Sequence, residues 1–98
     1  MIPISEATRT RLRTLFRESD WEEAEIRLAT ECADDLPLTE EFERIRFAVL
    51  KLSEGDLEKL GQAIDEAKCD WRDVLVWAGF GDDHRAHWSW QPRRPEGQ

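Results

Sequence analysis

Two histidines and an acid near the end of the chain are the residues best suited to bind a metal. His84 and His87 lie three positions apart beside Asp83, so the two rings share one face if residues 83–88 turn helically. Structural zinc takes four ligands and prefers thiolates, whereas a predicted helix separates Cys69 from these histidines. We therefore expect no metal or cofactor, with a metal site at His84, His87 and Asp83 as an alternative.

No arrangement typical of nucleophilic catalysis occurs in the sequence. Ser89 lies near His87 and Asp83 along the chain, but no nucleophile motif surrounds it. Gly79 and Gly81 follow a predicted helix rather than preceding one, and two acids come next, so this glycine pair is unsuited to bind phosphate. We predict no catalytic residue and expect no enzymatic activity, with an enzyme built on the two histidines as the alternative.

Aromatic residues concentrate near the C-terminus. Five of the nine fall within twenty positions: Trp71, Trp77, Phe80, Trp88 and Trp90. Tryptophan and arginine are the residues that most often dominate binding energy at protein interfaces. We therefore predict that a partner contacts Trp88, Trp90, Arg85 and Phe80. The alternative is a C-terminal segment that folds back to cover the core.

The size and composition indicate a single small domain. With 98 residues, 40% hydrophobic and 37% charged, the chain is long enough for one core and too apolar for disorder. We expect one helical domain over residues 1–90 and a mobile tail over 91–98, which has no apolar anchor. The start of the chain lacks a secretory pattern and no apolar run could span a membrane, so we expect a cytoplasmic protein. Cys32 and Cys69 are then reduced thiols, mostly buried.

The formal net charge of −8 disfavours direct binding to nucleic-acid phosphates, which proteins neutralise with lysine and arginine. An acidic protein that imitates nucleic acid and occupies a basic partner is an alternative function. Four arginines in the first helix interrupt such a surface: Arg9, Arg11, Arg13 and Arg17.

Capping signals and periodicity predict an all-α fold. Asp20, Ser53 and Asp70 are each followed three positions later by an acid, which is typical of a helix start, and Ser5 and Thr39 are further candidate caps. We predict a compact array of about five helices, over residues 6–17, 21–34, 40–53, 57–68 and 71–79, with a short aromatic C-terminal segment. No segment alternates apolar and polar residues over the length of a strand.

Two of these helices have more apolar residues than one buried stripe requires. In the helix over 40–53, Phe47 lies among charged positions, and we expect neighbours to cover this helix on two sides. The helix over 71–79 is apolar nearly all round, so it is either buried or contacts a partner. Gly79 is in the position where a left-handed residue ends such a helix.

The segments over residues 43–55 and 70–80 resemble a family of small uncharacterised bacterial proteins. The resemblance covers the second half of the chain at most. It implies a bacterial, cytoplasmic protein and attaches no activity, ligand or partner to any residue.

These observations favour a non-enzymatic protein-interaction module, such as a small acidic adaptor, regulator or immunity-type protein. Its partner is expected to be another protein or a second copy of the chain. Nucleic acid and membrane are not expected partners. An acidic nucleic-acid mimic and a metal-binding protein or enzyme using the His84 and His87 region are the competing interpretations.

Overall fold

A computed structural model describes residues 2–32, 41–81 and 85–92 of the chain. Within these ranges the secondary structure is helical and contains no strand, which confirms the all-α prediction. The elements are α1 (Glu6–Leu15), the 3₁₀ helix η1 (Glu18–Asp20), α2 (Trp21–Thr30), α3 (Glu41–Ser53), α4 (Leu57–Trp77) and α5 (Ala86–Ser89).

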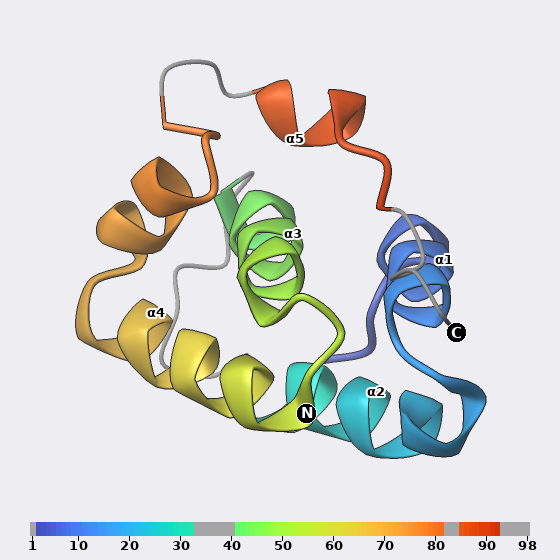
Figure 1. Ribbon diagram of the computed structural model, residues 1–98. Coiled ribbons are helices and arrows are strands. Elements are labelled where there is room, and N and C mark those ends of the chain that lie inside the picture. Colours follow the sequence, from blue (N-terminus) through green and yellow to red (C-terminus); the bar gives the residue numbers. More distant parts are fainter. Residues whose placement is uncertain (1, 33–40, 82–84, 93–98) are drawn as a thin grey trace.

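Helix α3 lies at the centre of the molecule, and the other four α-helices surround it (Figure 1). Its most extensive packing is against α4, with further contacts to α1 and α5. Phe47 and Leu50, which point away from the main apolar stripe of α3, are both fully buried. The prediction that neighbours cover this helix on two sides is therefore confirmed.

Short polar residues begin the helices through hydrogen bonds to the backbone. Ser5 Oγ accepts from the Thr8 N–H at 3.1 Å. Asp56 Oδ1 accepts from the N–H groups of Glu58 and Lys59, which satisfies two donors that a helix start leaves without partners. Asp20 precedes α2 as predicted, although its side chain makes no capping bond.

The prediction that Ser53 begins a helix is wrong. Ser53 is the last residue of α3, and its hydroxyl donates to the Leu50 carbonyl. Glu54 and Gly55 then adopt positive φ angles of 53° and 80°, which ends the helix before Asp56 caps the next one. A Cβ atom at Gly55 would lie 2.5 Å from the Leu15 carbonyl oxygen, so only glycine fits this turn between α3 and α4.

Helix α4 joins the two helices predicted over 57–68 and 71–79 and ends at Trp77, two residues before the predicted end. The two parts join at Asp70, whose φ of −155° and ψ of 97° are not helical, and the ribbon bends there (Figure 1). Asp70 Oδ1 accepts from the Arg72 N–H, so Asp70 caps residues 71–77, hereafter the second part of α4. Gly79 follows with a φ of 83°, as expected for the residue that ends a helix.

Helices α1 and α2 are shorter than predicted. Phe16 leaves α1 in an extended conformation and buries its side chain, so the helix ends at Leu15 rather than at residue 17. Helix α2 ends at Thr30, and residues 33 and 34 of the predicted helix lie outside the described residues. The same holds for Thr39 and for residues 93–98 of the predicted tail.

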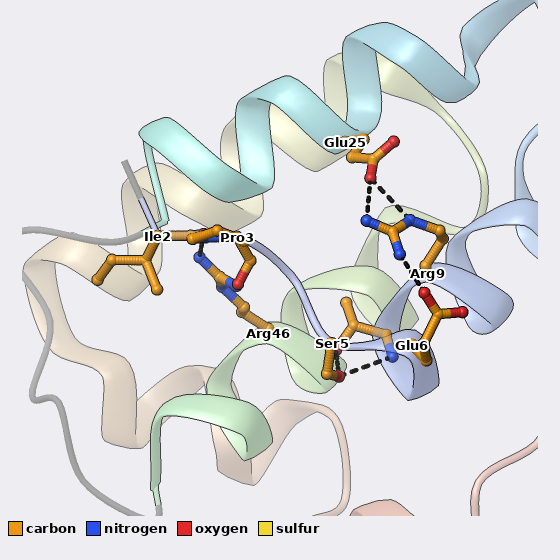
Figure 2. Close-up of polar contacts among 8 residues, drawn as sticks. Ile2, Pro3, Ser5, Glu6, Arg9, Glu25 and Arg46 are labelled. Atoms are coloured by element: carbon orange, nitrogen blue, oxygen red, sulfur yellow. Dashed lines mark hydrogen bonds and ion pairs between the residues drawn. The ribbon is translucent and has the colours of Figure 1, made fainter.

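A buried arginine attaches the N-terminal segment to α3. The Arg46 guanidinium, in a side chain only 2% exposed, donates to the carbonyls of Ile2, Pro3, Leu28 and Cys32 at 2.6–3.2 Å. Figure 2 shows Arg46 reaching from α3 to the first two of these residues. We call this set the Arg46 network. It joins the start of the chain, the C-terminal end of α2 and the central helix.

A half-buried charge cluster lies beside the Arg46 network. Arg9 on α1 binds the Glu25 carboxylate of α2 at 2.7 Å and also pairs with Glu6 (Figure 2). Ion pairs that solvent reaches contribute little to stability. The first two helices are therefore positioned mainly by the buried Arg46 network and the apolar core.

Candidate interaction surface

The C-terminal segment packs its rings against Phe47 of α3. The ring centroids of His87, Trp88 and Trp90 lie 5.0, 5.2 and 6.3 Å from that of Phe47, all in edge-to-face arrangements. Such pairs add about 0.5–1.5 kcal/mol each beyond the area they bury. The alternative expectation is that the C-terminal segment folds back to cover the core. It holds for the part of this segment whose rings pack on Phe47.

Arg11 of α1 binds the same cluster from the other side. Its guanidinium carbon lies 4.4 Å from the centre of the Phe47 ring, and Nε donates to the Trp90 carbonyl at 3.2 Å. A second bond runs to the Ala7 carbonyl within α1. Burial lowers the pKa of Arg11, but the guanidinium stays charged at neutral pH. Arg11 and Phe47 together fix the C-terminal segment on α1 and α3.

The four residues predicted to bind a partner differ in their exposure to solvent. Trp88 is 50% exposed and Arg85 is exposed, while Trp90 is partly buried. Phe80 is only 2% exposed, and its amide donates to the Leu75 carbonyl at the end of α4. Phe80 belongs to the core and has almost no area for a partner, which removes it from the candidate surface.

Of the three residues of the alternative metal site, only His87 lies among the described residues. His87 is 3% exposed and lies 4.8 Å from the Trp88 ring, so aromatic groups cover it. His84 and Asp83 lie outside the described residues. In the part of the chain that the structure describes, no three His, Cys, Asp or Glu side chains gather where they could hold a metal ion.

The two cysteines have opposite environments. Cys32 is fully buried, and burial raises the pKa of its thiol to about 11. Cys69 is exposed, which corrects the expectation that both thiols are mostly buried. It lies at the bend in α4, immediately before Asp70, where the side chain faces solvent.

Two exposed apolar residues on α4 were not among the predicted site residues. In its second part, Val74 and Leu75 are buried, whereas Val76 is 64% and Trp77 is 56% exposed. The nearly all-round apolar pattern of residues 71–79 was the signal, because a helix of seven residues cannot bury every face against one neighbour. Three of the four large apolar side chains exposed among the described residues lie in the last third of the chain: Val76, Trp77 and Trp88, the fourth being Ile26.

A shallow hollow lies on each side of this exposed pair. One, of about 360 Å³, is lined by Trp71, Leu75 and Val76 together with Arg44, Arg72 and Gly81. The other, of about 250 Å³, is lined by Leu52, Ala63 and Trp77 together with Lys59, Gln62 and Glu66. We call Arg72, Val76, Trp77, Arg85 and Trp88 the C-terminal surface.

No family model, curated protein or solved structure matches this chain. The resemblance of residues 43–55 and 70–80 to a bacterial family therefore stays a prediction. Among the described residues, no helix combines the length and the apolar composition that crossing a membrane requires.

Proposed function

We propose that this protein is a non-enzymatic interaction module whose partner protein contacts the C-terminal surface. The observation behind the proposal is the exposure of Val76, Trp77 and Trp88, three of the four large apolar side chains that are exposed among the described residues. Val76 and Trp77 are adjacent in the chain, and exposed apolar residues that lie together on a small domain are typical of binding sites. An adaptor, regulator or immunity-type role remains within this proposal.

The chemistry of these residues suits a protein partner. A tryptophan at the centre of an interface contributes about 2 kcal/mol or more when a partner covers it, and an adjacent pocket increases the area buried. Trp77 lies beside the 250 Å³ hollow and Val76 beside the 360 Å³ hollow, so a partner side chain can enter next to each. Cytoplasmic action is part of the proposal and is supported by two free cysteines.

One observation favours the acidic nucleic-acid mimic as a second candidate. Three of the 14 basic residues, Arg11, Arg44 and Arg46, are at most 8% exposed. The surface is therefore more acidic than the sequence total indicates. A partner recognised in this way would be basic, and added salt would weaken its binding steeply.

Site-specific photo-cross-linking tests the proposal. Benzoylphenylalanine is placed at Trp77 or Trp88, or at Asp65 on the exposed acidic face of α4, and the protein is irradiated in an extract of its own cells. We expect a discrete adduct from positions 77 and 88 that excess unlabelled protein removes. The Val76→Ser/Trp77→Ser protein should not remove it.

Two results distinguish the candidates. Adducts from position 65 that disappear with added salt, without adducts from 77 or 88, favour the acidic mimic. If the double variant competes away the adduct from position 77 as well as the unaltered protein does, the side chains of Val76 and Trp77 contribute nothing to binding. The proposal of an interaction module at this surface is then wrong.

A further inference from the structure

One face of α4 carries opposite charges at equal distances from its centre. Four of its residues recur at spacings of three and four, which places them on one side of the helix, and all four line the hollow beside Trp77: Lys59, Gln62, Ala63 and Glu66. The lysine, glutamine and glutamate are exposed, and the alanine is buried. The midpoint between Lys59 and Glu66 falls between Gln62 and Ala63. We call these four residues the α4 stripe.

We infer that the α4 stripe binds the same stripe of a second copy of the chain, with the two helices antiparallel about a two-fold axis between Gln62 and Ala63. A symmetric dimer needs a surface that complements itself, so that residue i contacts residue j and j contacts i. Here Lys59 of each copy faces Glu66 of the other, which gives two opposite-charge pairs about 10 Å apart along the helix. The inference rests on the proposed function at Trp77, and it identifies the partner there as a second copy.

Neighbouring acids are compatible with this contact. Glu58 and Asp65 lie about 100° and 120° from Lys59 around the helix axis, in the direction opposite to the buried Leu60, so they point away from the facing helix. Lys59 lies 3.6 Å from the Glu54 carboxylate, but both side chains are exposed and an ammonium has three N–H donors. Lys59 can therefore bind a facing carboxylate as well.

The net charge of −8 on each copy opposes association at long range. At physiological salt, exposed charges more than about 8 Å apart are largely screened. The charges that face one another across the contact therefore decide whether two stripes bind and in which direction.

Trp77 adds apolar area at the edge of the α4 stripe. Its side chain is more than half exposed and lines the same hollow as Ala63 and Leu52. The small side chain of Ala63 lets a second helix approach closely, and that approach covers part of the indole ring. Stable dimers bury about 800 Å² on each copy, more than two helical turns and one ring provide. The expected dimer is therefore weak and reversible.

Reversing the two charges separately provides the test. Lys59→Glu turns both facing pairs into pairs of carboxylates, and Glu66→Lys turns both into pairs of ammonium groups. Sedimentation velocity of the full chain, at micromolar to millimolar concentrations, should show a monomer–dimer equilibrium that each variant weakens about tenfold or more. An equimolar mixture of the two variants should associate again, because their stripes complement each other.

Arg17→Glu and Glu22→Lys are the matched control pair, since they make the same changes of charge at exposed residues outside α4. Their mixture measures what net charge alone contributes. The inference requires a larger recovery in the mixture of α4 variants than in this control. A chain that stays monomeric at millimolar concentration, variants that associate as the unaltered protein does, or a recovery no larger than the control overturns it.

The inference and the proposed function fail in different ways. An adduct from position 77 with twice the mass of the chain supports both. Cross-links from position 77 to a different protein, without self-association, leave the interaction module and remove the second copy. Association of the two complementary variants, without discrete adducts from 77 or 88, leaves the α4 dimer and removes the module at the C-terminal surface.

Discussion

The two ends of the described chain are attached to the core by the same kind of residue, but to different extents. Arg46 donates to four carbonyls from two separate segments and is 2% exposed. Arg11 donates to only one carbonyl outside its own helix, that of Trp90, and is 8% exposed. The N-terminal segment is therefore part of the core, while the C-terminal segment is a thinner layer over Phe47.

Because the two segments are attached to different extents, substitutions near Arg46 should affect stability, whereas substitutions at the C-terminal surface should affect binding. The hydrogen bonds from Arg46 to the Leu28 and Cys32 carbonyls are buried, so losing them leaves two carbonyls without the donor and without water to replace it. Around the C-terminal surface, Val76, Trp77 and Trp88 remain exposed, and changes to them leave few buried groups unsatisfied. Substitutions at the two ends should thus affect different measurements.

The largest expected effect is on stability at Arg46. Arg46→Met retains the apolar stem but leaves four carbonyls without their donor, two of them in buried hydrogen bonds, at a cost of about 3–5 kcal/mol in the free energy of unfolding. Urea denaturation measures this change, with the exposed Arg17→Met as the matched control, expected within about 0.5 kcal/mol of the unaltered protein. Equal stability of the two variants would show that Arg46 does not secure the N-terminal segment.

The Cys32 thiol, next to the Arg46 network, should make stability fall at alkaline pH. Its pKa is raised by burial from 9.0 to about 11, so the unfolded chain loses this proton first. The stabilisation is fully present below pH 9 and is lost between pH 9 and 11, with a magnitude of about 2–3 kcal/mol. Denaturation across this range is compared between the unaltered protein and Cys32→Ala.

Thiol labelling gives an independent measure of the burial of Cys32, with the exposed Cys69 as the reference. At pH 8, the exposed Cys69 should react rapidly with a thiol reagent, and Cys32 only as fast as the protein unfolds. Two equally fast thiols would mean that the region around Cys32 opens readily.

A smaller effect is expected at Arg11. Arg11→Met removes one hydrogen bond to the C-terminal segment and the cation–π contact with Phe47, at a cost of about 1–2 kcal/mol. Tryptophan fluorescence should shift to longer wavelength as Trp88 and Trp90 become more exposed. A loss of stability as large as that of Arg46→Met would remove the distinction between the two ends.

Local signals in the sequence predicted most of the fold. Asp56, Asp70 and Gly79 act within a few residues of their own position, so the predicted start near residue 57, the division at residue 70 and the end near residue 79 agree with the structure. The prediction at Ser53 is wrong because Gly55 decides where α3 ends: its φ is positive, and the Leu15 carbonyl of α1 leaves no room there for a Cβ atom.

The buried arginines were not predicted, because charge in a sequence usually indicates a solvated face. A signal was present: Thr8, Arg11, Leu12 and Leu15 are all buried and follow helical spacing, so Arg11 lies within the apolar stripe of α1. The same spacing relates Phe42, Ile45, Arg46 and Val49 in α3. The sequence does not show which carbonyls accept hydrogen bonds from these arginines, because the carbonyls belong to distant segments of the chain.

Exposure within the C-terminal region also depends on tertiary packing. Trp77 and Phe80 are equally apolar in the sequence, yet Phe80 folds back onto α4 after Gly79 and is covered, while Trp77 is not. The sequence thus predicts a concentration of aromatic residues, and only the packing shows which of them a partner can reach.

The smallest effect on stability is expected at the exposed pair. Val76→Ser with Trp77→Ser removes side chains that are more than half exposed, so unfolding should become easier by about 1 kcal/mol or less. Leu75→Ala in the same helical turn, where the side chain is 4% exposed, should cost about 2–5 kcal/mol. Urea denaturation of both variants separates a binding surface from a core position within one short helix. A loss in the double variant as large as that of Leu75→Ala would place Val76 and Trp77 in the core, and the C-terminal surface would then have no apolar area on α4 to offer a partner.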